Sequence, residues 1–219
     1  MSGGEIAPDI PICYTTRITT REWQDLKTLR YPFDEKSVRA LKAGDAVSIS
    51  GRIYTGRDKF HKFVADGGRL PVDFRDGALY HCGPVVVRTN ASNSDVPEYA
   101  VRAAGPTTSV RENSYEPEFI EKSGVRLIIG KGGMDSRTLA AMKRFGCVYV
   151  QAVGGAGALY ADAVKKVSGV SLLDEFGAAE AVWHFDVVDF RGVVAMDSHG
   201  VSLFESVAAE SQKICGKIV

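Results

Sequence analysis

The segment VRLIIGKGGMDSRTLAAMKRFGCVYV, residues 125–150, predicts the fold class of this chain. It opens with a short apolar strand and continues with a glycine-rich turn, GKGG, at 130–133. Asp135 or Ser136 can cap a helix that ends at Gly146, because polar caps and a final glycine are favoured at these positions. The apolar stretch CVYV then predicts a second strand. This order of strand, helix and strand is typical of an α/β layer structure with a partly parallel sheet.

The alternation continues on both sides of this segment. Downstream, a small-residue loop at 154–157 precedes a predicted helix over 159–167, and strands are expected at 183–187 and 193–196. The predicted upstream elements are a strand within 10–22, helices over 34–43 and 58–65, and strands at 45–53 and 85–87.

The composition is that of an ordinary globular protein. Lys and Arg number 27 and Asp and Glu number 27 in 219 residues, so no overall charge favours nucleic acid. No apolar run reaches the roughly 18 residues that a membrane-spanning helix needs. MSGGEIAPDI lacks the pattern of a secretory signal. We expect a leader at 1–17, a domain at 18–206 and a tail at 207–219.

The cysteine pattern indicates the redox environment in which the protein is found. The four cysteines lie far apart and form no CxxC pair, and a chain with this much apolar sequence has no need of a disulfide framework. A reducing, cytoplasmic location is therefore the prediction, with the mitochondrial matrix as the alternative.

Two motifs combine a cation with groups that bind anions. GKGG lies between a strand and a helix, where backbone amides and the helix dipole favour an anion, and Lys131 adds a positive charge. GPTTSVR, residues 105–111, places Thr107, Thr108 and Arg111 after a Gly-Pro turn, and hydroxyls with a guanidinium can hold a carboxylate. The plainer interpretation of either motif alone is a solvated turn.

Other motifs favour structural explanations. In GRDKFH, Asp58 can cap a helix, and His61 is interpreted as a packed structural residue because its helix neighbours are apolar. GGAG at 154–157 departs from the dinucleotide fingerprint, since Tyr160 stands where glycine or alanine belongs. The histidines show no metal-ligand spacing, and no three cysteines are grouped for an iron–sulfur cluster. We therefore expect no metal site in this chain.

Seven motifs follow one another in a characteristic order. They are SGRIYTGRDKFH (50–61), YHCGPV (80–85), AAGPTTSVR (103–111), IIGKGGM (128–134), YVQAVGGAGAL (149–159), EAVWHFDVVDF (180–190) and MDSHGVSLFE (196–205). Their order and spacing resemble the β subunit of two-subunit class I fumarases and L-tartrate dehydratases, and equally the C-terminal domain of single-chain class I fumarases. The resemblance covers residues 18–206, and the pairing of GPTTSVR with IGKGGM is its most specific part.

The resemblance implies a fold, a cofactor and a partner. The fold would be a swivelling β/β/α domain with a mixed sheet flanked by helices. A partner α subunit, in an αβ or α2β2 assembly, would hold a [4Fe–4S] cluster with three cysteines of its own, and the active site would lie between the subunits. The resemblance implies that the substrate-binding residues are Arg57, Thr107, Thr108, Arg111 and Lys131, with catalytic roles for Thr107, Arg111 and Lys131.

These residue types suit dehydration of a C4 2-hydroxy dicarboxylic acid, such as malate to fumarate or L-tartrate to oxaloacetate. Removing the proton next to a carboxylate leaves a dianionic aci-carboxylate, which nearby cations stabilise. We expect Arg57, Arg111 and Lys131 to do this and to position the substrate. The partner's iron would act as the Lewis acid on the leaving hydroxyl. Thr107 is the candidate in this chain for proton abstraction.

The sequence departs from the family pattern at three places. Glu112 and Asn113 follow Arg111 where Met-Asp is usual, Asp135 stands where glycine is more frequent, and His199 replaces a different small or polar residue. None of these changes removes a proposed site residue, but they bear on the choice among malate, tartrate and mesaconate-like substrates.

Two alternative functions remain from the sequence. One is a non-catalytic dicarboxylate-binding or assembly protein that kept the fold without a cluster-bearing partner. The other is a nucleotide-dependent oxidoreductase, suggested by the GGAG loop alone.

Overall fold

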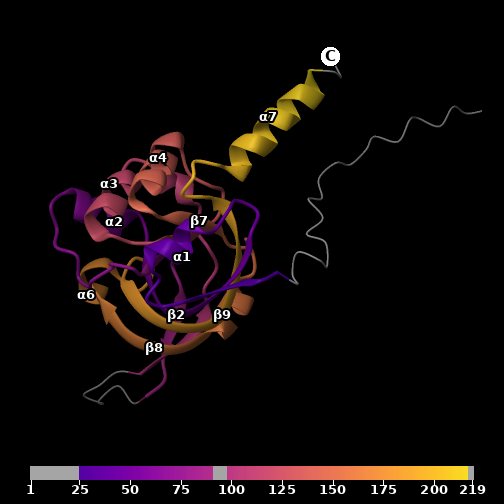
Figure 1. Cartoon of the computed structure of the whole chain (residues 1–219). Coiled ribbons are helices and arrows are strands. Elements are labelled where there is room, and N and C mark those ends of the chain that lie inside the picture. The colour runs from indigo at the N-terminus through magenta and orange to yellow at the C-terminus, as the bar shows by residue number, and fades with distance from the viewer. Residues whose placement is uncertain (1–24, 91–97, 217–219) are drawn as a thin grey trace, which may run out of the picture.

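The computed structural model describes residues 25–90 and 98–216, which form the predicted α/β fold (Figure 1). The predicted leader, the predicted strand within 10–22 and Cys13 lie outside these residues. The strands are β1 (Lys27–Arg30), β2 (Ala46–Gly56), β3 (Ala78–His81), β4 (Val85–Arg88), β5 (Tyr99–Ala103), β6 (Leu127–Gly130), β7 (Val148–Gln151), β8 (Val164–Ser171) and β9 (Val182–Met196). The helices are α1 (Glu35–Arg39), α2 (Asp58–Ala65), the 3₁₀ helix η1 (Ser109–Glu112), α3 (Glu116–Ser123), α4 (Ser136–Phe145), α5 (Gly157–Ala163), α6 (Leu173–Phe176) and α7 (Leu203–Cys215).

The main sheet closes on itself. Strands β2, β3, β6 and β7 are parallel neighbours in that order. Strand β9 is antiparallel to both β7 and β2, and Val193 is paired on both edges, with Gln151 and Ala46. These five strands therefore form a ring, whose curvature is visible in Figure 1. Strands β1 and β8 extend it beside β2 and β9, and β4 and β5 form a separate hairpin.

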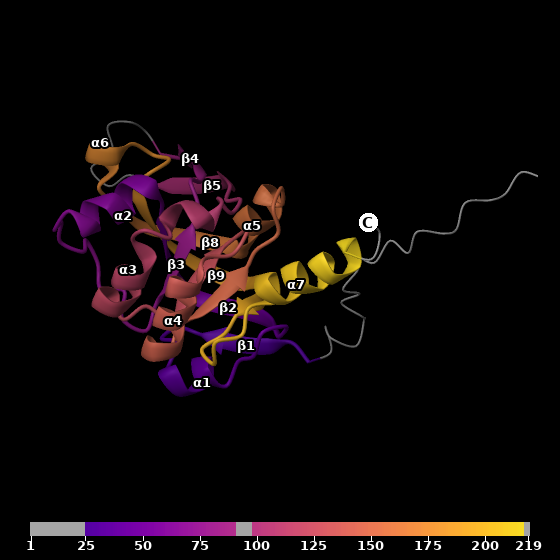
Figure 2. The same cartoon turned by 90° about the horizontal axis from the view of Figure 1, so that it is seen from above.

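Alternating residues of the ring strands divide the core in two. In β6, Leu127 and Ile129 belong to one buried cluster and Ile128 to another, as expected when successive side chains point to opposite faces. The first cluster takes side chains from all five ring strands and fills the ring. The second includes residues of α2, α3 and α4, so these helices cover the outer face; Figure 2 shows them grouped together.

Helix α4 is built as the sequence predicts. The side chain of Asp135 accepts a hydrogen bond from the Thr138 N–H, and Gly146 ends the helix in a left-handed conformation with φ 71°. Such a cap satisfies backbone groups that a helix end leaves unpaired.

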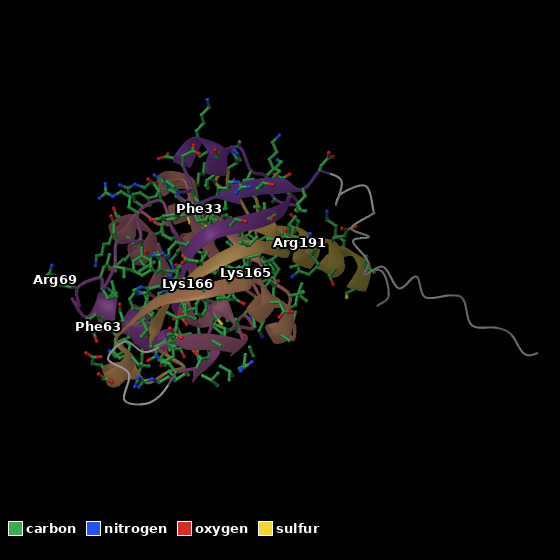
Figure 3. The ribbon with its side chains drawn as sticks, turned by 90° about the horizontal axis from the view of Figure 1, so that it is seen from below. Phe33, Phe63, Arg69, Lys165, Lys166 and Arg191 are labelled. Carbon is green, nitrogen blue, oxygen red and sulfur yellow. The ribbon has the colours of Figure 1, made fainter. Side chains whose placement is uncertain are left out.

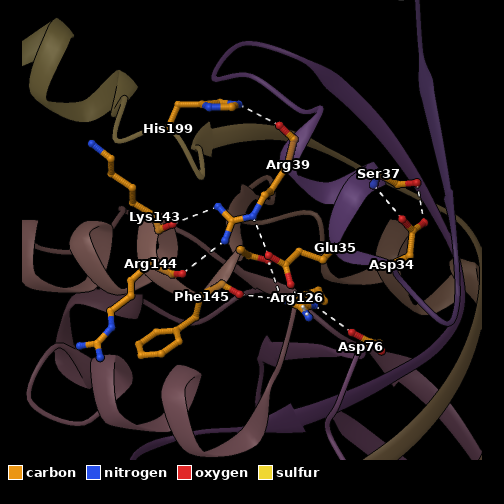
Figure 4. Close-up of polar contacts among 11 residues, drawn as sticks. Asp34, Glu35, Ser37, Arg39, Asp76, Arg126, Lys143, Arg144, Phe145 and His199 are labelled. Atoms are coloured by element: carbon orange, nitrogen blue, oxygen red, sulfur yellow. Dashed lines mark hydrogen bonds and ion pairs between the residues drawn. The ribbon is translucent and has the colours of Figure 1, made fainter.

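Two arginines hold the carboxyl end of α4 against the rest of the fold (Figure 4). Arg39 donates to the carbonyl oxygens of Lys143 and Arg144 at 3.0 and 3.3 Å. Arg126 donates to the carbonyl oxygen of Phe145 at 2.6 Å and also pairs with the carboxylates of Glu35 and Asp76.

Three sequence predictions need correction. The helix predicted over 159–167 is wrong in its second half, because α5 ends at Ala163 and the next eight residues form β8, with Val167 opposite Phe185 of β9. Pairing with a free strand edge outweighs a weak helical pattern. The two strands predicted at 183–187 and 193–196 are one strand, β9, that continues through Asp189 at φ 55°.

The third correction concerns the helix predicted over 34–43. Helix α1 ends at Arg39, since the chain then enters a turn in which the Lys42 N–H donates to the Asp45 carboxylate at 2.6 Å.

Helix α7 crosses the expected domain boundary at 206. None of its residues is buried, and Figures 1 and 2 show it projecting from the body. Across the described ranges, no helix combines the length and apolar character needed to cross a membrane.

Candidate functional site

The predicted site residues gather at one edge of the ring. Arg57 follows the last residue of β2, and Lys131 follows the last residue of β6. Since β2, β3, β6 and β7 are parallel, their carboxyl ends meet at this edge, where α/β sheets commonly bind ligands.

The segment that carries the threonine pair lies along this edge. Thr107 N–H donates to the His81 carbonyl oxygen at 2.7 Å, and Ser109 N–H donates to the Lys131 carbonyl oxygen at 3.0 Å. Thr108 and Lys131 form an isolated parallel bridge. Backbone hydrogen bonds therefore tie the two motifs GPTTSVR and GKGG together.

Four of the five predicted residues are joined through their side chains. Arg111 Nη2 donates to Thr107 Oγ1 at 2.7 Å, and Lys131 Nζ donates to Thr108 Oγ1 at 3.1 Å. Each threonine hydroxyl thus has its own cation. Arg111 also lies 3.5 Å from Asp58 Oδ1, and both of these side chains are more than two-fifths exposed.

Arg57 lies at the same edge but has different contacts. Its Nη2 is 3.4 Å from Glu180 Oε1, and its Nη1 donates to the Ala179 carbonyl oxygen at 3.4 Å. A side chain at Gly83 would overlap the guanidinium, so that glycine makes room for it. The Nε atom of Arg57 is buried and has no hydrogen-bond partner among the described residues. Among the described residues, the side-chain hydrogen bonds of Thr107, Thr108, Arg111 and Lys131 do not involve Arg57.

The expectation that Asp58 caps α2 is wrong. Arg57 holds the cap position, without a side-chain cap hydrogen bond, and Asp58 is the first helical residue. Its carboxylate instead faces Arg111, a pairing that the sequence separation of these residues concealed.

The glycines of GKGG have more than one purpose. A Cβ at Gly130 would fall on Ser109 Oγ, so the close approach of the 105–111 segment requires glycine there. Gly132 and Gly133 have φ of 84° and 76°, which glycine adopts most readily. The turn is thus shaped to hold Lys131 beside Thr108.

Sequence reasoning missed a buried polar cluster directly behind the threonine segment. His61 Nε2 lies 2.9 Å and His81 Nε2 lies 3.2 Å from the same oxygen, Oε2 of Glu116, and all three side chains are fully buried. His61 is packed in the core as predicted. The three residues come from α2, β3 and the start of α3, so no short spacing marks them.

The charges of this cluster are strongly perturbed. Burial alone would raise the pKa of Glu116, but the two histidines outweigh it and lower that pKa to about 2. Burial raises the pKa of Glu112 to about 8, with the Asp58 carboxylate adding to the effect. Glu116 is therefore a carboxylate at neutral pH, whereas Glu112 is mostly protonated.

The three side chains of this cluster are also close enough together to bind one metal ion. Ligand atoms of His61, His81 and Glu116 lie within 4.8 Å of one another. His61 Nδ1 lies 3.0 Å from the Arg57 carbonyl oxygen, which can only accept, so Nδ1 carries a proton and Nε2 is the nitrogen that faces Glu116. A second proton on Nε2 would give a cation that balances Glu116 without any added ion. We therefore describe it as an ion-pair cluster.

The described cysteines do not fit an iron–sulfur cluster. Cys82 and Cys147 are buried and Cys215 is exposed near the end of α7. Burial raises the pKa of both Cys82 and Cys147, which disfavours the thiolates that iron binds.

A cleft of about 860 Å³ lies beside the Lys131 side chain. Its lining includes residues 151–154 and also Lys165 and Arg191, which Figure 3 labels. Its lining is largely apolar, and the exposed residues Val153, Leu159 and Val188 belong to it. A Cβ at Gly154 would lie 3.3 Å from the Lys131 side chain, so the cleft and the site are contiguous.

Comparison with known proteins gives a consistent set of relatives. The protein-family model described as "Fumarase C-terminus" matches residues 10–207. "Putative fumarate hydratase class I" of Geobacillus stearothermophilus is 49% identical over 184 residues, which cover 84% of this chain and 34% of the relative. "Putative L(+)-tartrate dehydratase subunit beta" of Methanocaldococcus jannaschii is 41% identical over 187 residues, 82% of this chain and 93% of the relative. "L(+)-tartrate dehydratase subunit beta" of Escherichia coli K12 is 33% identical over 190 residues, 86% of this chain and 89% of the relative.

Proposed function

The chain belongs to the fumarase C-terminus family, and from this premise we propose that it is the β subunit of a hydro-lyase acting on a C4 2-hydroxy dicarboxylic acid. The family suggested by the order of the seven motifs is thereby confirmed. Two relatives are named as tartrate dehydratase β subunits and one as a class I fumarate hydratase, so malate and L-tartrate are the two substrates to test.

The observation that carries this proposal is the pairing of two adjacent hydroxyls with two cations. Arg111 donates to Thr107 and Lys131 donates to Thr108, at the edge where the parallel strands end. A dicarboxylate bound here would meet two cations and two hydroxyls on two adjacent segments, GPTTSVR and GKGG. Arg57, which follows β2 at the same edge, adds a further positive charge.

These residues suit the hardest step of a dehydration. The proton next to a carboxylate is weakly acidic, and its removal places a second negative charge on that carboxylate. Arg111 and Lys131 would stabilise this charge. We assign proton abstraction to Thr107, because the guanidinium 2.7 Å from its oxygen stabilises negative charge there.

The rest of the active site is proposed to come from a partner chain. The Geobacillus relative is about three times as long as the matched region, whereas the two β subunits are matched over most of their length. We propose an α subunit that carries the [4Fe–4S] cluster, since the described cysteines of this chain do not form a ligand set. Departure of the hydroxyl is assigned to that partner.

A second candidate is a dicarboxylate-binding protein without catalysis. The same two cations and two hydroxyls would support binding alone, so only the presence of a partner and of turnover separates the two functions.

The decisive experiment is anaerobic co-expression with the candidate α chain, followed by ultraviolet assays of fumarate from malate and oxaloacetate from L-tartrate. We expect activity with one substrate and a loss of about 10²–10³-fold in kcat/KM for Lys131→Ala, the scale for removing one charge-stabilising donor. Lys122→Ala is the matched control, because Lys122 is exposed and pairs only with Glu118 on its own helix among the contacts described. A cluster-loaded complex without activity on either acid, or an unimpaired Lys131→Ala, would contradict the proposal.

A further inference from the structure

His81 holds the threonine segment at two points. Its carbonyl oxygen accepts from the Thr107 N–H at 2.7 Å, and its ring Nδ1 lies 2.8 Å from Ser109 Oγ. Ser109 is fully buried, and its own N–H donates to the Lys131 carbonyl oxygen at 3.0 Å. The orientation of the His81 ring therefore affects the position of the backbone that carries Thr107, Thr108 and Lys131.

The ring of His81 is in turn oriented by the buried cluster. Its Nε2 faces Glu116 Oε2 at 3.2 Å, and His61 Nε2 faces the same oxygen at 2.9 Å. The rings of His61 and His81 are 5.2 Å apart at an interplanar angle of 74°. No side chain of the three is exposed to solvent, so water cannot replace any of these contacts.

The proton positions follow from the chemistry of the partners. His61 Nδ1 donates to a carbonyl oxygen, and its Nε2 is attracted to a carboxylate only if it too carries a proton. Burial opposes this charge, but Glu116 outweighs it and raises the pKa of His61. Burial lowers the pKa of His81, which is therefore neutral beside the His61 cation.

A neutral His81 has one ring proton, and the negative charge of Glu116, 3.2 Å from Nε2 at an ion-pair distance without hydrogen-bond alignment, favours that proton on Nε2. Nδ1 is then an acceptor, so the Ser109 hydroxyl donates to it. Ser109 Oγ is left to accept from the Tyr149 hydroxyl at 2.9 Å. Both hydroxyls therefore have a defined acceptor: Tyr149 donates to Ser109, and Ser109 donates to His81.

We propose that His81 and Glu116 are positioning residues of the hydro-lyase site. Glu116 fixes the tautomer and orientation of His81. Through its contacts with Ser109 and the Thr107 N–H, His81 then holds the segment that carries Thr107 and Thr108, and with it Lys131, in place. This inference rests on the proposed function for its catalytic consequence, but its charge assignment stands independently. His61 supplies the balancing cation. Glu112 of η1 also faces His61, and the charge of Asp58 on α2 acts on His81. Tyr149 of β7, and Cys147 just before that strand, interact electrostatically with Glu116.

The charge assignment can be tested on the full chain without any activity assay. Nitrogen NMR of histidine-labelled protein at pH 7 should show His61 protonated on both nitrogens and His81 neutral with its proton on Nε2. His61→Asn and His81→Asn assign the signals. A charged His81, a proton on its Nδ1, or one equivalent of a divalent metal found by elemental analysis would overturn the inference.

The positioning role is tested in the α-containing complex with Glu116→Gln, which keeps the shape and removes the charge. We expect kcat to fall roughly tenfold or more with a smaller change in KM, because the reacting groups lose alignment more than the substrate loses contacts. The same variant should abolish the doubly protonated signal of His61. Glu118→Gln, on an exposed residue of the same helix, is the matched control and should change neither.

A milder variant keeps the inference testable if the Glu116→Gln protein does not fold. Tyr149→Phe deletes the hydroxyl that donates to Ser109 and accepts from the Gly133 N–H, and we expect a reduction in kcat of about twofold to fivefold in a protein that still unfolds cooperatively. A folded Glu116→Gln complex with unchanged kcat, or an unchanged kcat for Tyr149→Phe, would overturn the inference. An inactive wild-type complex would refute the proposed function alone, since the NMR result is independent of it.

Discussion

At the scale of single residues, Glu112 shows how one departure from the family pattern alters the site's surroundings. It stands next to Arg111, is fully buried, and lies 3.5 Å from His61 Nδ1. Burial first, and the nearby Asp58 carboxylate second, raise its pKa from 4.5 to about 8. Between about pH 4.5 and pH 8, the folded protein therefore keeps a proton on this carboxyl group, whereas the unfolded chain has released it.

This proton gives the stability a pH dependence of known sign. Because the folded-state pKa is the higher one, the stabilising contribution is complete below pH 4.5 and is lost as the pH rises through about 8. Glu112→Gln removes the titration. We expect it to raise the free energy of unfolding at pH 8.5 by about 1–2 kcal/mol, after allowance for screening, and to change it little at pH 4.5.

Urea denaturation of both proteins at the two pH values measures this difference. Glu121→Gln, at an exposed position of α3, is the control and should leave the pH dependence unaltered. A variant that keeps the full loss of stability between the two pH values would show that Glu112 is not the group responsible.

At the scale of elements, the carboxyl end of α4 depends on Arg126 for its connection to the ring. Its side chain is only 15% exposed, and it contacts Glu35, Asp76 and the last carbonyl oxygens of α4. Those oxygens have no partner within the helix and need donors from outside. The contact also links α4 to α1, as Figure 4 shows.

We expect Arg126→Met to lower the free energy of unfolding by about 2–4 kcal/mol, because it leaves the Asp76 carboxylate and two carbonyl oxygens without their donor and leaves Glu35 with Arg39 alone. Chemical denaturation followed by circular dichroism measures the change. Arg69→Met is the control, since Arg69 is exposed and extends into solvent in Figure 3. Equal stabilities of the two variants would show that this connection is unimportant.

At the scale of the whole molecule, the closed ring of strands forms the base of the site and leaves its functional edge open. The site cations are partly exposed, and an apolar cleft with Val153, Leu159 and Val188 adjoins them. Contiguous apolar surface next to a polar site is typical of a surface that a partner covers. The arrangement agrees with a site completed by a second chain.

The isolated chain should therefore fold but not turn over substrate. We expect one cooperative thermal transition and no detectable dehydration of malate or L-tartrate until the α chain is added. Circular dichroism and the ultraviolet assay on the same preparation test both parts. Robust turnover by this chain alone, without iron, would contradict the assignment of the remaining chemistry to a partner.

The sequence alone determined the elements with strong local signals and the residues within short motifs. Helix α4 was predictable because its cap, apolar spacing and terminal glycine are all local. Thr107, Thr108, Arg111 and Lys131 were found because two motifs carry them, and the structure joins them. The roles of these residues remain predictions.

The tertiary structure decided what depends on distant partners. Strand β8 exists because β9 offers it an edge, and the ring closes because Val193 pairs with both Ala46 and Gln151. His61, His81 and Glu116 meet only because three elements converge, and their charges arise from shared burial. No local pattern encodes such contacts, since the free energy that selects them comes from long-range pairing and from the removal of water.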